Sequence, residues 1–513
     1  MSARPDIVLL VLDTQRRDRL SCYGFPQETT PHLDRLSADA TRFDQAFSAA
    51  QWTVPSHTSM FTGRYVPSHR TEQSYSILPP SIPTLAERLR EAGYYTTAFC
   101  NNPLVGVVNN GLRRGFFSFL NYSGLMTSRP NQAGARPTLI DRYRQLFKRA
   151  LSGVLHRIQD SFARSDWLLS FSFTPIMVPL WQTALSFKGN TPRSLGDAAK
   201  LLIERRGLER DQPVFSFINL MGTHAPYQAH PRHLARFAPD VKRSSAAQKF
   251  IRRFNSDVFG WLAPLTGAID AERKAILDGV YNAETAGQDE QVGIFIERLR
   301  SSGALDNTLL IVCADHGEHL GEHQFMGHSF TAYNELLHVP LIIRDPSGNL
   351  PRGTTVGGTV STRRIFQTAL TAAGAAHPDE EPYTLANSNG NDPDAHTVFA
   401  DAVPVTNVLN MMRRRRPDLV RDHRCDQTRR VIVHNDLKLI QTGEHAVELY
   451  NVRRDPHEQQ ELSSIFPEQV ETLEQSLVRH LDVSRRSAPE AAVSEQEDSP
   501  EVQRRLRDLG YLE

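Results

Sequence analysis

Apolar residues occur along this chain in short, nearly continuous runs, separated by segments in which they recur every three or four positions. Such runs are typical of strands buried on both faces, and the segments between them are typical of helices with one apolar face. The expected strands lie at residues 6–12, 94–100, 214–220, 308–314 and 339–345. The expected helices lie at residues 30–40, 81–93 and 272–303. Helices between buried strands predict an α/β fold with a large central, mostly parallel sheet covered by helices.

Two regions interrupt this alternation. Residues 120–210 contain a basic helical stretch and then a run of apolar and aromatic residues at 167–181. We interpret residues 120–210 as a helical insertion or lid that packs over the site. The alternative is a surface that contacts lipid or a hydrophobic substrate through residues 155–185. Residues 376–396 are rich in turn formers and predict a linker or an exposed loop.

The C-terminal part of the chain predicts a smaller α+β subdomain. Short strands are expected at residues 429–436, 437–443 and 446–452, and a helix is expected to begin at Pro467. The expected organisation is a catalytic domain at 1–375, a C-terminal subdomain at 376–485, and a mobile tail with a closing helix at 486–513.

Composition excludes several classes of protein. The chain has 513 residues, and its 58 basic residues balance its 58 acidic ones, so charge does not favour binding to nucleic acid. The four cysteines are widely spaced and form no CxxC pair, which argues against a zinc cluster and a disulfide framework. The first apolar run is too short for a signal peptide, and no apolar run reaches the 18 residues of a membrane span. The expected location is therefore the cytoplasm.

Acidic and imidazole side chains follow three of the expected strands. Asp13 follows the first strand, His224 follows the third, and Asp315 and His316 follow the fourth. Ligands of parallel sheets bind beyond the carboxyl ends of the strands, so these groups could converge on one cation. A single Asp after a strand is usually a helix cap or a turn residue. The segment 315–328, however, holds four histidines and three acids in 14 residues, which favours a metal site.

Thr53 lies at the expected start of a helix in the stretch "TVPSHTSMFTG". Its hydroxyl could bind the cation, which would lower the hydroxyl pKa and make Thr53 a nucleophile. The N-terminus of the helix would favour an anionic group beside it. Thr53 could also be no more than the N-cap of the helix, and this interpretation does not exclude the first.

These motifs resemble the sulfatases of the alkaline phosphatase superfamily over most of the chain. The resemblance rests on "DIVLLVLDT", "LSCYG", the frame "PSxxxxxTGR" at 55–64, "THAPY", "DHGEHLGEH", "HVPLIIR", "ELYNVRRDPHEQQEL" and "RLRDLGYLE". It implies a large α/β domain with a smaller C-terminal sheet domain, and an enzyme that acts on anionic esters.

The chain departs from the sulfatase pattern at the reacting position. Relatives that hydrolyse sulfate esters carry Cys or Ser at the position of Thr53, which is converted to formylglycine, and the converting machinery reads an Arg at the position of His57. We therefore expect no formylglycine here. Thr14 replaces a second metal-binding Asp. The Lys that relatives usually carry after the next strand is absent, with Asn101 and Asn102 in that area, and His328 aligns with another Lys.

A threonine nucleophile is similar to the phospho-transferring relatives, such as lipoteichoic acid synthases, phosphoethanolamine transferases and nucleotide pyrophosphatases. This resemblance implies one divalent cation, Mn²⁺, Zn²⁺ or Ca²⁺, held by Asp13, Thr53, Asp315 and His316. It implies that His224 and His328 contact the oxygens of the substrate or protonate the leaving group. His57 is a further catalytic candidate, and Asn102 is a candidate for binding the substrate.

Together these observations predict a metal-dependent enzyme that hydrolyses or transfers a sulfate, phosphate or phosphonate ester. Its substrate is expected to be a small anionic ester, or a glycan or lipid-linked molecule. One alternative is a catalytically inactive sulfatase homologue that only binds its ligand. Another is a membrane-peripheral enzyme that modifies lipid-linked glycans. The sequence leaves open the organic part of the substrate and the oligomeric state.

Overall fold

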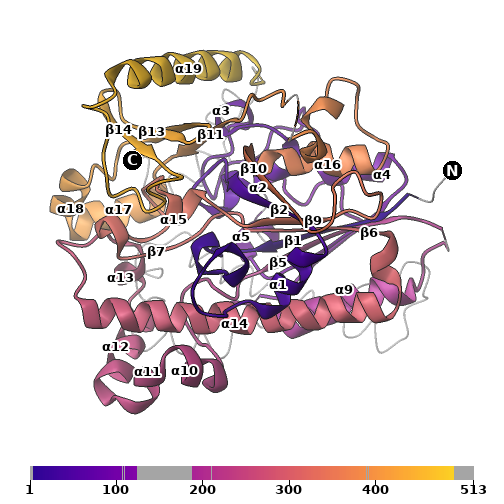
Figure 1. Cartoon of the computed structure of the whole chain (residues 1–513), viewed down its shortest axis with the longest axis horizontal. Coiled ribbons are helices and arrows are strands. Elements are labelled where there is room, and N and C mark those ends of the chain that lie inside the picture. Colours follow the sequence, from indigo (N-terminus) through magenta and orange to yellow (C-terminus); the bar gives the residue numbers. More distant parts are fainter. Residues whose placement is uncertain are drawn as a thin grey trace, which may run out of the picture.

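The computed structural model describes residues 4–123 and 188–489, apart from positions 107, 109, 210, 389 and 391. In this part of the chain an eight-stranded sheet forms the centre, with the strand order β10-β2-β9-β6-β1-β5-β3-β4 (Figure 1). Neighbouring strands are parallel, except that β9 runs antiparallel to both β2 and β6. The predicted α/β class with a mostly parallel sheet is confirmed. The strands are β1 (Asp6–Leu12), β2 (Thr41–Phe47), β3 (Tyr95–Cys100), β4 (Ser118–Asn121), β5 (Val214–Leu220), β6 (Thr308–Cys313), β9 (Leu341–Arg344) and β10 (Thr354–Ser361).

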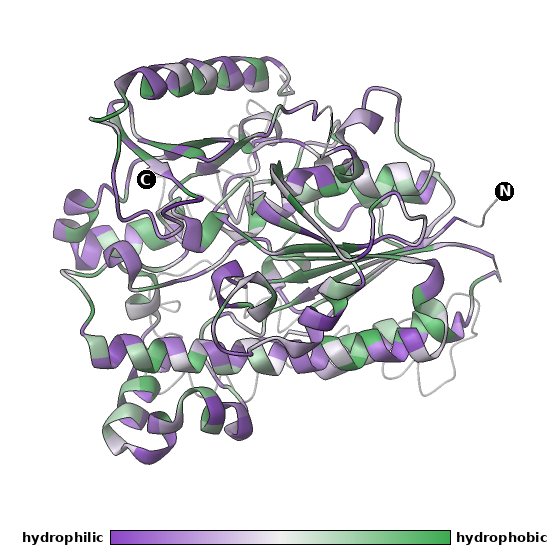
Figure 2. Cartoon of the chain, in the orientation of Figure 1, coloured by the Kyte–Doolittle hydropathy of each residue, from purple (hydrophilic) through white to green (hydrophobic). Residues whose placement is uncertain are grey.

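Helices cover both faces of this sheet, and successive residues of β1 pack against opposite layers. Val8 and Leu10 face one layer, which contains α1 (Pro31–Ala38), α9 (Thr191–Glu204) and the long α14 (Ala271–Ser301). Ile7 and Leu9 face the other layer, which contains α2 (Thr53–Thr62), α4 (Leu85–Glu91) and α16 (Ile365–Ala372). Figure 2 shows hydrophobic residues concentrated in the central strands, whereas α14 and α19 (Pro467–Arg486) alternate between hydrophobic and hydrophilic positions. This three-layer packing explains why the strand sequences are apolar throughout.

The five expected strands are present as β1, β3, β5, β6 and β9. β9 is shorter than residues 339–345 because Pro340 has no N–H to contribute to the ladder. Three strands of the central sheet, β2, β4 and β10, were not expected. β2 alternates between buried and half-buried positions at its start and includes Arg42 and Asp44, so it lacks the continuous apolar run of a central strand.

The expected helices are present as α1, α4 and α14. α4 begins only at Leu85 because Thr84 and Glu87 form a capping box, in which each side chain accepts a hydrogen bond from the other residue's backbone N–H. The remaining described α-helices are α3 (Val66–His69), α5 (Pro103–Gly106), α10 (Pro231–Phe237), α11 (Pro239–Arg243), α12 (Ser245–Ser256), α13 (Val258–Leu262), α15 (Asn334–Leu337), α17 (Thr406–Arg415) and α18 (Pro417–Asp422).

A second, antiparallel sheet forms the C-terminal part of the structure. It contains β11 (Thr397–Ala402), β12 (Arg429–His434), β13 (Leu437–Thr442) and β14 (Ala446–Asn451) in sequence order. One face packs on α19, and the other packs against Phe47, Ala332 and Leu337 of the large part. The second sheet therefore lies against the segment that follows β8 (Met326–Gly327) as well as against the end of β2.

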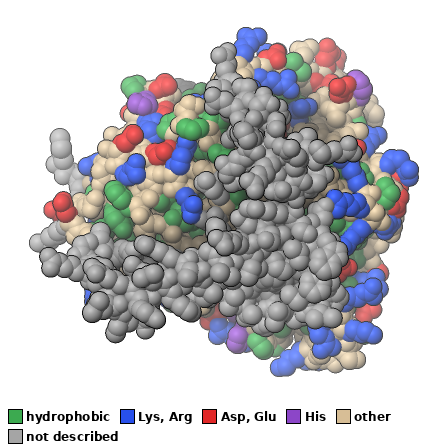
Figure 3. Space-filling model, turned by 180° about the vertical axis from the view of Figure 1, so that it is seen from behind, with side chains coloured by type: hydrophobic (Ala, Val, Ile, Leu, Met, Phe, Trp, Pro, Cys, Tyr) green, Lys and Arg blue, Asp and Glu red, His purple; other side chains and the backbone are tan. Residues whose placement is uncertain are grey.

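Several predicted features fall outside the described residues. These are most of the insertion expected at 120–210, including the surface at 155–185, and most of the tail expected at 486–513. Helix α9, at the described end of that insertion, packs on the central sheet. None of the described helices combines the length and low polarity that crossing a bilayer requires. On the face opposite to that of Figure 1, the visible basic and acidic side chains are interspersed, in keeping with the balanced charge (Figure 3).

Candidate functional site

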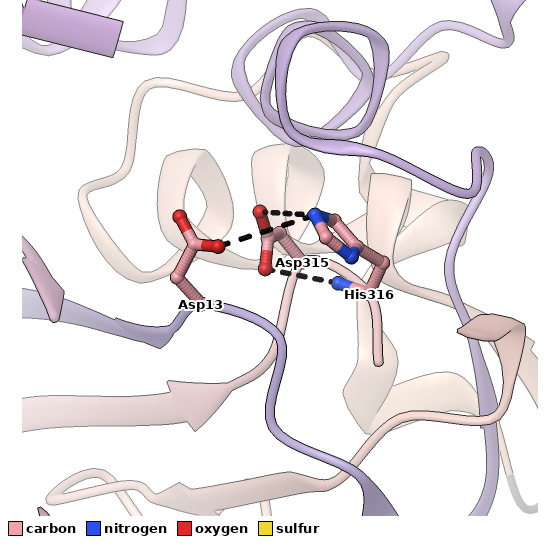
Figure 4. Close-up of side chains that lie close together, drawn as sticks. All are labelled: Asp13, Asp315 and His316. Atoms are coloured by element: carbon pink, nitrogen blue, oxygen red, sulfur yellow. Dashed lines mark hydrogen bonds and ion pairs between the residues drawn. The ribbon is translucent and has the colours of Figure 1, made fainter. Parts of the chain in front are cut away.

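Asp13 and Asp315 lie at the same level beyond two adjacent strands. β1 and β6 are parallel, and their last paired residues are Val11 and Cys313, so each aspartate lies two residues beyond this pair. His316 follows Asp315, and all three side chains are fully buried. The Nε2 atom of His316 lies 3.4 Å from Oδ2 of Asp315 and 4.0 Å from Oδ1 of Asp13 (Figure 4). The parallel register therefore brings together residues that are about 300 positions apart in sequence.

Each of the two carboxylates has one oxygen that is satisfied and one that is not. Oδ1 of Asp315 accepts hydrogen bonds from the backbone N–H groups of His316 (3.0 Å) and Thr14 (3.3 Å). Oδ2 of Asp13 accepts one from Asn102 (2.6 Å). The other oxygens, Oδ1 of Asp13 and Oδ2 of Asp315, have no hydrogen-bond partner among the described residues. Buried carboxylate oxygens without a partner are costly unless a cation faces them.

The protonation states suit a cation site. Burial raises the pKa of Asp315 well above its usual range, and the negative charge of Asp13 adds to this effect. Burial lowers the pKa of His316 well below its usual value, so its ring is neutral. Nδ1 of His316 donates to the carbonyl oxygen of Gly317 (2.9 Å), which leaves the lone pair of Nε2 for a ligand. The ligand atoms of the three residues lie within 4.8 Å of one another, so these residues fit one divalent cation.

Thr53 belongs to the same buried group. Its Oγ1 lies 3.3 Å from Nε2 of His316, and only 2% of the residue is exposed. The interpretation of Thr53 as the N-cap of the helix is wrong, because α2 begins at Thr53 and the N-cap is Trp52, whose side chain makes no capping hydrogen bond. The Thr53 hydroxyl is therefore not used to hold the helix end. Ser56 donates a hydrogen bond to the carbonyl oxygen of Asp315 (2.7 Å) and so ties α2 to the aspartate.

His57 lies one turn further along α2 and is fully buried. Its Nδ1 donates to the carbonyl oxygen of Thr53 (2.9 Å), and its Nε2 lies 3.4 Å from the amide nitrogen of Asn219. Its ring packs edge-on against Phe61 and Phe217, and burial lowers its pKa. Both ring nitrogens are thus engaged by protein groups, which favours a positioning role for His57 over proton transfer.

His224 and His328 lie beside His316 and are only partly buried, so they lie on the solvent side of the group. The His328 ring is 4.5 Å from that of His316 and 5.3 Å from that of His224. Burial lowers the pKa of His328, but the Glu318 carboxylate, 2.8 Å from Nδ1, opposes this effect and leaves the pKa raised. Burial and the charge on His328 lower the pKa of His224. Of the two imidazoles beside the buried aspartates, that of His328 is therefore the easier one to protonate.

The surroundings of Asp13 include one residue with an unexpected contact and one that the sequence analysis missed. Asn102 was expected to bind the substrate, but its amide donates to Oδ2 of Asp13, and its own oxygen accepts from the N–H of Leu104 (2.9 Å). Asn219, on β5, also donates to Oδ2 of Asp13 (3.3 Å). The sequence signal for Asn219 was an amide inside the mostly apolar run 214–220, because a buried polar group requires a partner.

Comparisons with known proteins find sequence relatives over most of the chain. The family model described as "Sulfatase" matches residues 5–375. An ulvan-active sulfatase of Formosa agariphila is 22% identical over 377 residues, which cover 73% of this chain and 63% of that protein. An arylsulfatase of Clostridium perfringens is 22% identical over 385 residues, which cover 73% of this chain and 76% of that protein. The chain thus spans less than two thirds of the first of these relatives.

Solved structures share the fold over nearly the whole chain. The phosphonate monoester hydrolase of Agrobacterium radiobacter superposes with a TM-score of 0.62 at 20% identity, over 94% of this chain and 96% of the other. A putative sulfatase of Bacteroides fragilis superposes with a TM-score of 0.64 at 16% identity, over 95% of this chain and 98% of the other. At identities this low, the superpositions establish a common fold. The reaction has to be inferred from the residues of the site.

Proposed function

Because this chain belongs to the sulfatase family, we propose that it is a metal-dependent hydrolase of a sulfate, phosphate or phosphonate ester that uses an unmodified Thr53 as its nucleophile. The observation that carries this proposal is the 3.3 Å distance between Oγ1 of Thr53 and Nε2 of His316, inside a buried group with Asp13 and Asp315. A hydroxyl in this position has no structural task, since it does not cap α2.

Asp13, Asp315, His316 and Thr53 would hold one divalent cation. When bound, such a cation would lower the pKa of the Thr53 hydroxyl and attract the negative oxygens of the ester. Imidazole together with carboxylate and hydroxyl oxygens suits Mn²⁺ or Zn²⁺ and is also compatible with Ca²⁺.

The chain's own residues would divide the remaining work. The hydroxyl of Thr53 would give its proton to a water molecule, and its Oγ1 would form a bond to the phosphorus or sulfur while the bond from that atom to the ester oxygen breaks. His328, whose pKa is raised by Glu318, would in its protonated form face the oxygens that gain negative charge and give a proton to the leaving alcohol. The free N–H groups at the start of α2 would add to this stabilisation. His57 would keep Thr53 in place through its carbonyl oxygen.

An unmodified threonine changes the second half of the reaction. The carbon that bears the Thr53 oxygen carries no second hydroxyl, so the covalent ester is released only when water, or an acceptor alcohol, attacks the phosphorus or sulfur. The same charged groups must therefore stabilise both steps. Hydrolysis and transfer differ only in which acceptor reaches the site.

The proposal is tested by a turnover assay with aryl sulfates, aryl phosphates, phosphonate monoesters and phosphodiesters, with Mn²⁺, Zn²⁺ or Ca²⁺ added. One structural neighbour, at 16% identity, is described in complex with its substrate D-glucosamine-2-N,6-O-disulfate, so sulfated amino sugars belong in the panel. Intact mass after a rapid acid quench should show a sulfate or phosphate adduct on Thr53. A protein that binds the metal and a ligand but turns over no ester of any class would instead be the inactive homologue.

A further inference from the structure

A second group of metal-ligand side chains lies outside the proposed active site. It consists of His323, Glu335 and Glu458, whose ligand atoms all lie within 4.8 Å of one another. His323 lies in the 3₁₀ turn η4 (Glu322–Gln324), Glu335 lies on α15, and Glu458 follows β14. Two nearby segments of the large part thus meet a residue that lies more than 100 positions further along the chain. Both glutamates are buried, with side-chain exposures of 2% and 0%.

Two of these residues present an atom without a hydrogen-bond partner. Among the described residues, Nε2 of His323 and Oε2 of Glu335 make no hydrogen bond, whereas Oε1 of Glu458 forms an ion pair with Lys438. Nε2 of His323 lies 3.7 Å from Oε2 of Glu335. Two ligands of a tetrahedral ion, with bonds of about 2.1 Å each, would lie about 3.4 Å apart. The observed separation therefore needs only a small movement to admit an ion.

The positions of these atoms are held by their neighbours. The His323 ring stacks on the ring of Tyr333, with centroids 3.7 Å apart and an interplanar angle of 8°. Oε2 of Glu458 accepts a hydrogen bond from the backbone N–H of Asn334 (2.6 Å), so the group is joined directly to α15. Ligands whose rotamers are already fixed lose little conformational entropy when an ion binds.

Cationic side chains lie against the two glutamates. Lys438 is fully buried, and its Nζ lies 2.7 Å from Oε1 of Glu458. His457 faces Glu335 at 3.8 Å from the side of the solvent, while the nearby Arg16 forms its ion pairs with Asp18 and Glu322. Ion pairs thus join the two buried carboxylates to one buried ammonium group and one more exposed imidazole.

We propose that His323, Glu335 and Glu458 form a second divalent-cation site, distinct from the group of Asp13, Asp315 and His316. One imidazole and two carboxylates are the donor set of Zn²⁺ or Mn²⁺. A carboxylate oxygen has more than one lone pair, so Oε1 of Glu458 can serve the ion and Lys438 together. The ion would fasten the C-terminal sheet to the loop 315–328, which also carries His316 and His328. Its role is structural and does not depend on the proposed reaction.

The experiment measures bound Zn²⁺ by elemental analysis after dialysis of the full chain. The Asp315→Ala variant removes a ligand of the first site and is expected to keep one equivalent. The double variant Asp315→Ala/His323→Ala is expected to keep none. The matched control is Asp315→Ala/His445→Ala, because His445 lies in the turn between β13 and β14 with a side chain that is 93% exposed. This protein should keep the one equivalent.

Thermal unfolding provides a second measurement in case a variant is poorly folded. Zn²⁺ should raise the Tm of Asp315→Ala and leave the Tm of the His323→Ala double variant unchanged, since only binding to the folded state stabilises it. Glu335→Gln, which keeps the shape of the side chain, should lose the same response in the Asp315→Ala background. If Asp315→Ala binds no Zn²⁺, or if His323→Ala leaves its content unchanged, the second site does not exist.

Discussion

Nδ1 of His328 lies 2.8 Å from Oε1 of Glu318, and both side chains are largely buried. This contact fixes the tautomer and the ring, so that the other nitrogen, Nε2, is the one free to serve a substrate. It also raises the pKa of His328 against the effect of burial. A histidine in this position therefore depends on Glu318 for the positive charge that a lysine would carry by itself.

His328→Ala should lower kcat by about 10²–10⁴-fold for esters whose leaving alcohol is a weak acid, as expected for the loss of a general acid. Esters with a nitrophenol leaving group need no such proton and should lose much less. Glu318→Gln should show the same dependence on the leaving group, to a smaller extent. Equal losses for all leaving groups would indicate that His328 only binds the anionic oxygens. Parallel assays on alkyl and nitrophenyl esters distinguish a general acid from a residue that only binds the anionic oxygens.

Thr53→Ala should abolish the covalent adduct and lower turnover by several orders of magnitude, because the attacking oxygen is gone. Thr53→Ser keeps a hydroxyl and should retain activity. Thr62→Ala is the matched control, since its hydroxyl lies in the same helix and, within the described part of the chain, bonds only to the carbonyl oxygen of Thr58 and the N–H of Arg64. Turnover close to that of the wild type in Thr53→Ala would mean that water attacks directly.

Thr53 should remain chemically unmodified in the purified protein. Oxidation of a threonine side chain gives a ketone, whereas formylglycine is an aldehyde made from Cys or Ser. His57 in addition replaces the arginine of the recognition sequence. Mass mapping of the peptide that contains residues 51–64 should show the unmodified mass. A loss of two hydrogens at Thr53 would overturn this expectation.

Asn102→Ala should weaken metal binding by about 10–100-fold, the usual cost of losing a side chain that orients a metal ligand. The reason is the hydrogen bond from Asn102 to Oδ2 of Asp13. Asn101→Ala is the control, because its amide donates to Thr191. Metal titration and steady-state kinetics distinguish a role in orienting Asp13 from a role in binding the substrate. A raised KM at unchanged metal affinity would restore the earlier prediction that Asn102 binds the substrate.

The titration of Asp401 should lower the free energy of unfolding as the pH rises from about 4 to about 7. Burial raises its pKa to about 7, although Arg430 opposes this effect. Between the unfolded and folded pKa values the folded state holds the additional proton. The stability contributed below the unfolded pKa is therefore lost as the pH rises, by about 1.4 kcal/mol per pH unit for one group.

Asp401→Asn removes this titration and should be more stabilising, relative to wild type, at pH 8 than at pH 5. Urea unfolding midpoints at the two pH values measure the difference. Asp422→Asn serves as the control, since this carboxylate is exposed. A difference between Asp401→Asn and wild type that does not change with pH would show that Asp401 is charged throughout.

The sequence by itself determined the class of the fold and pointed to two carboxylates of the buried group. The runs at 6–12 and 308–314 are apolar because both faces of the central strands are covered by helices, and this is a local pattern. Asp13 and Asp315 are recognisable because polar side chains that follow such strands end at the same edge of a parallel sheet. The domain boundaries and the roles of the site residues remain predictions.

Only the tertiary structure decided what depends on contacts between distant segments. β2 and β10 are strands of the central sheet that pair with each other. The hydrophobic pattern of either segment alone does not reveal this pairing. The hydrogen bonds of Asn102 and Asn219 to Asp13 depend on the register of three neighbouring strands. The meeting of His323, Glu335 and Glu458 likewise depends on how the C-terminal sheet packs on the large part. Apolar periodicity is a property of neighbouring residues, whereas the convergence of polar atoms is created by packing across the whole chain.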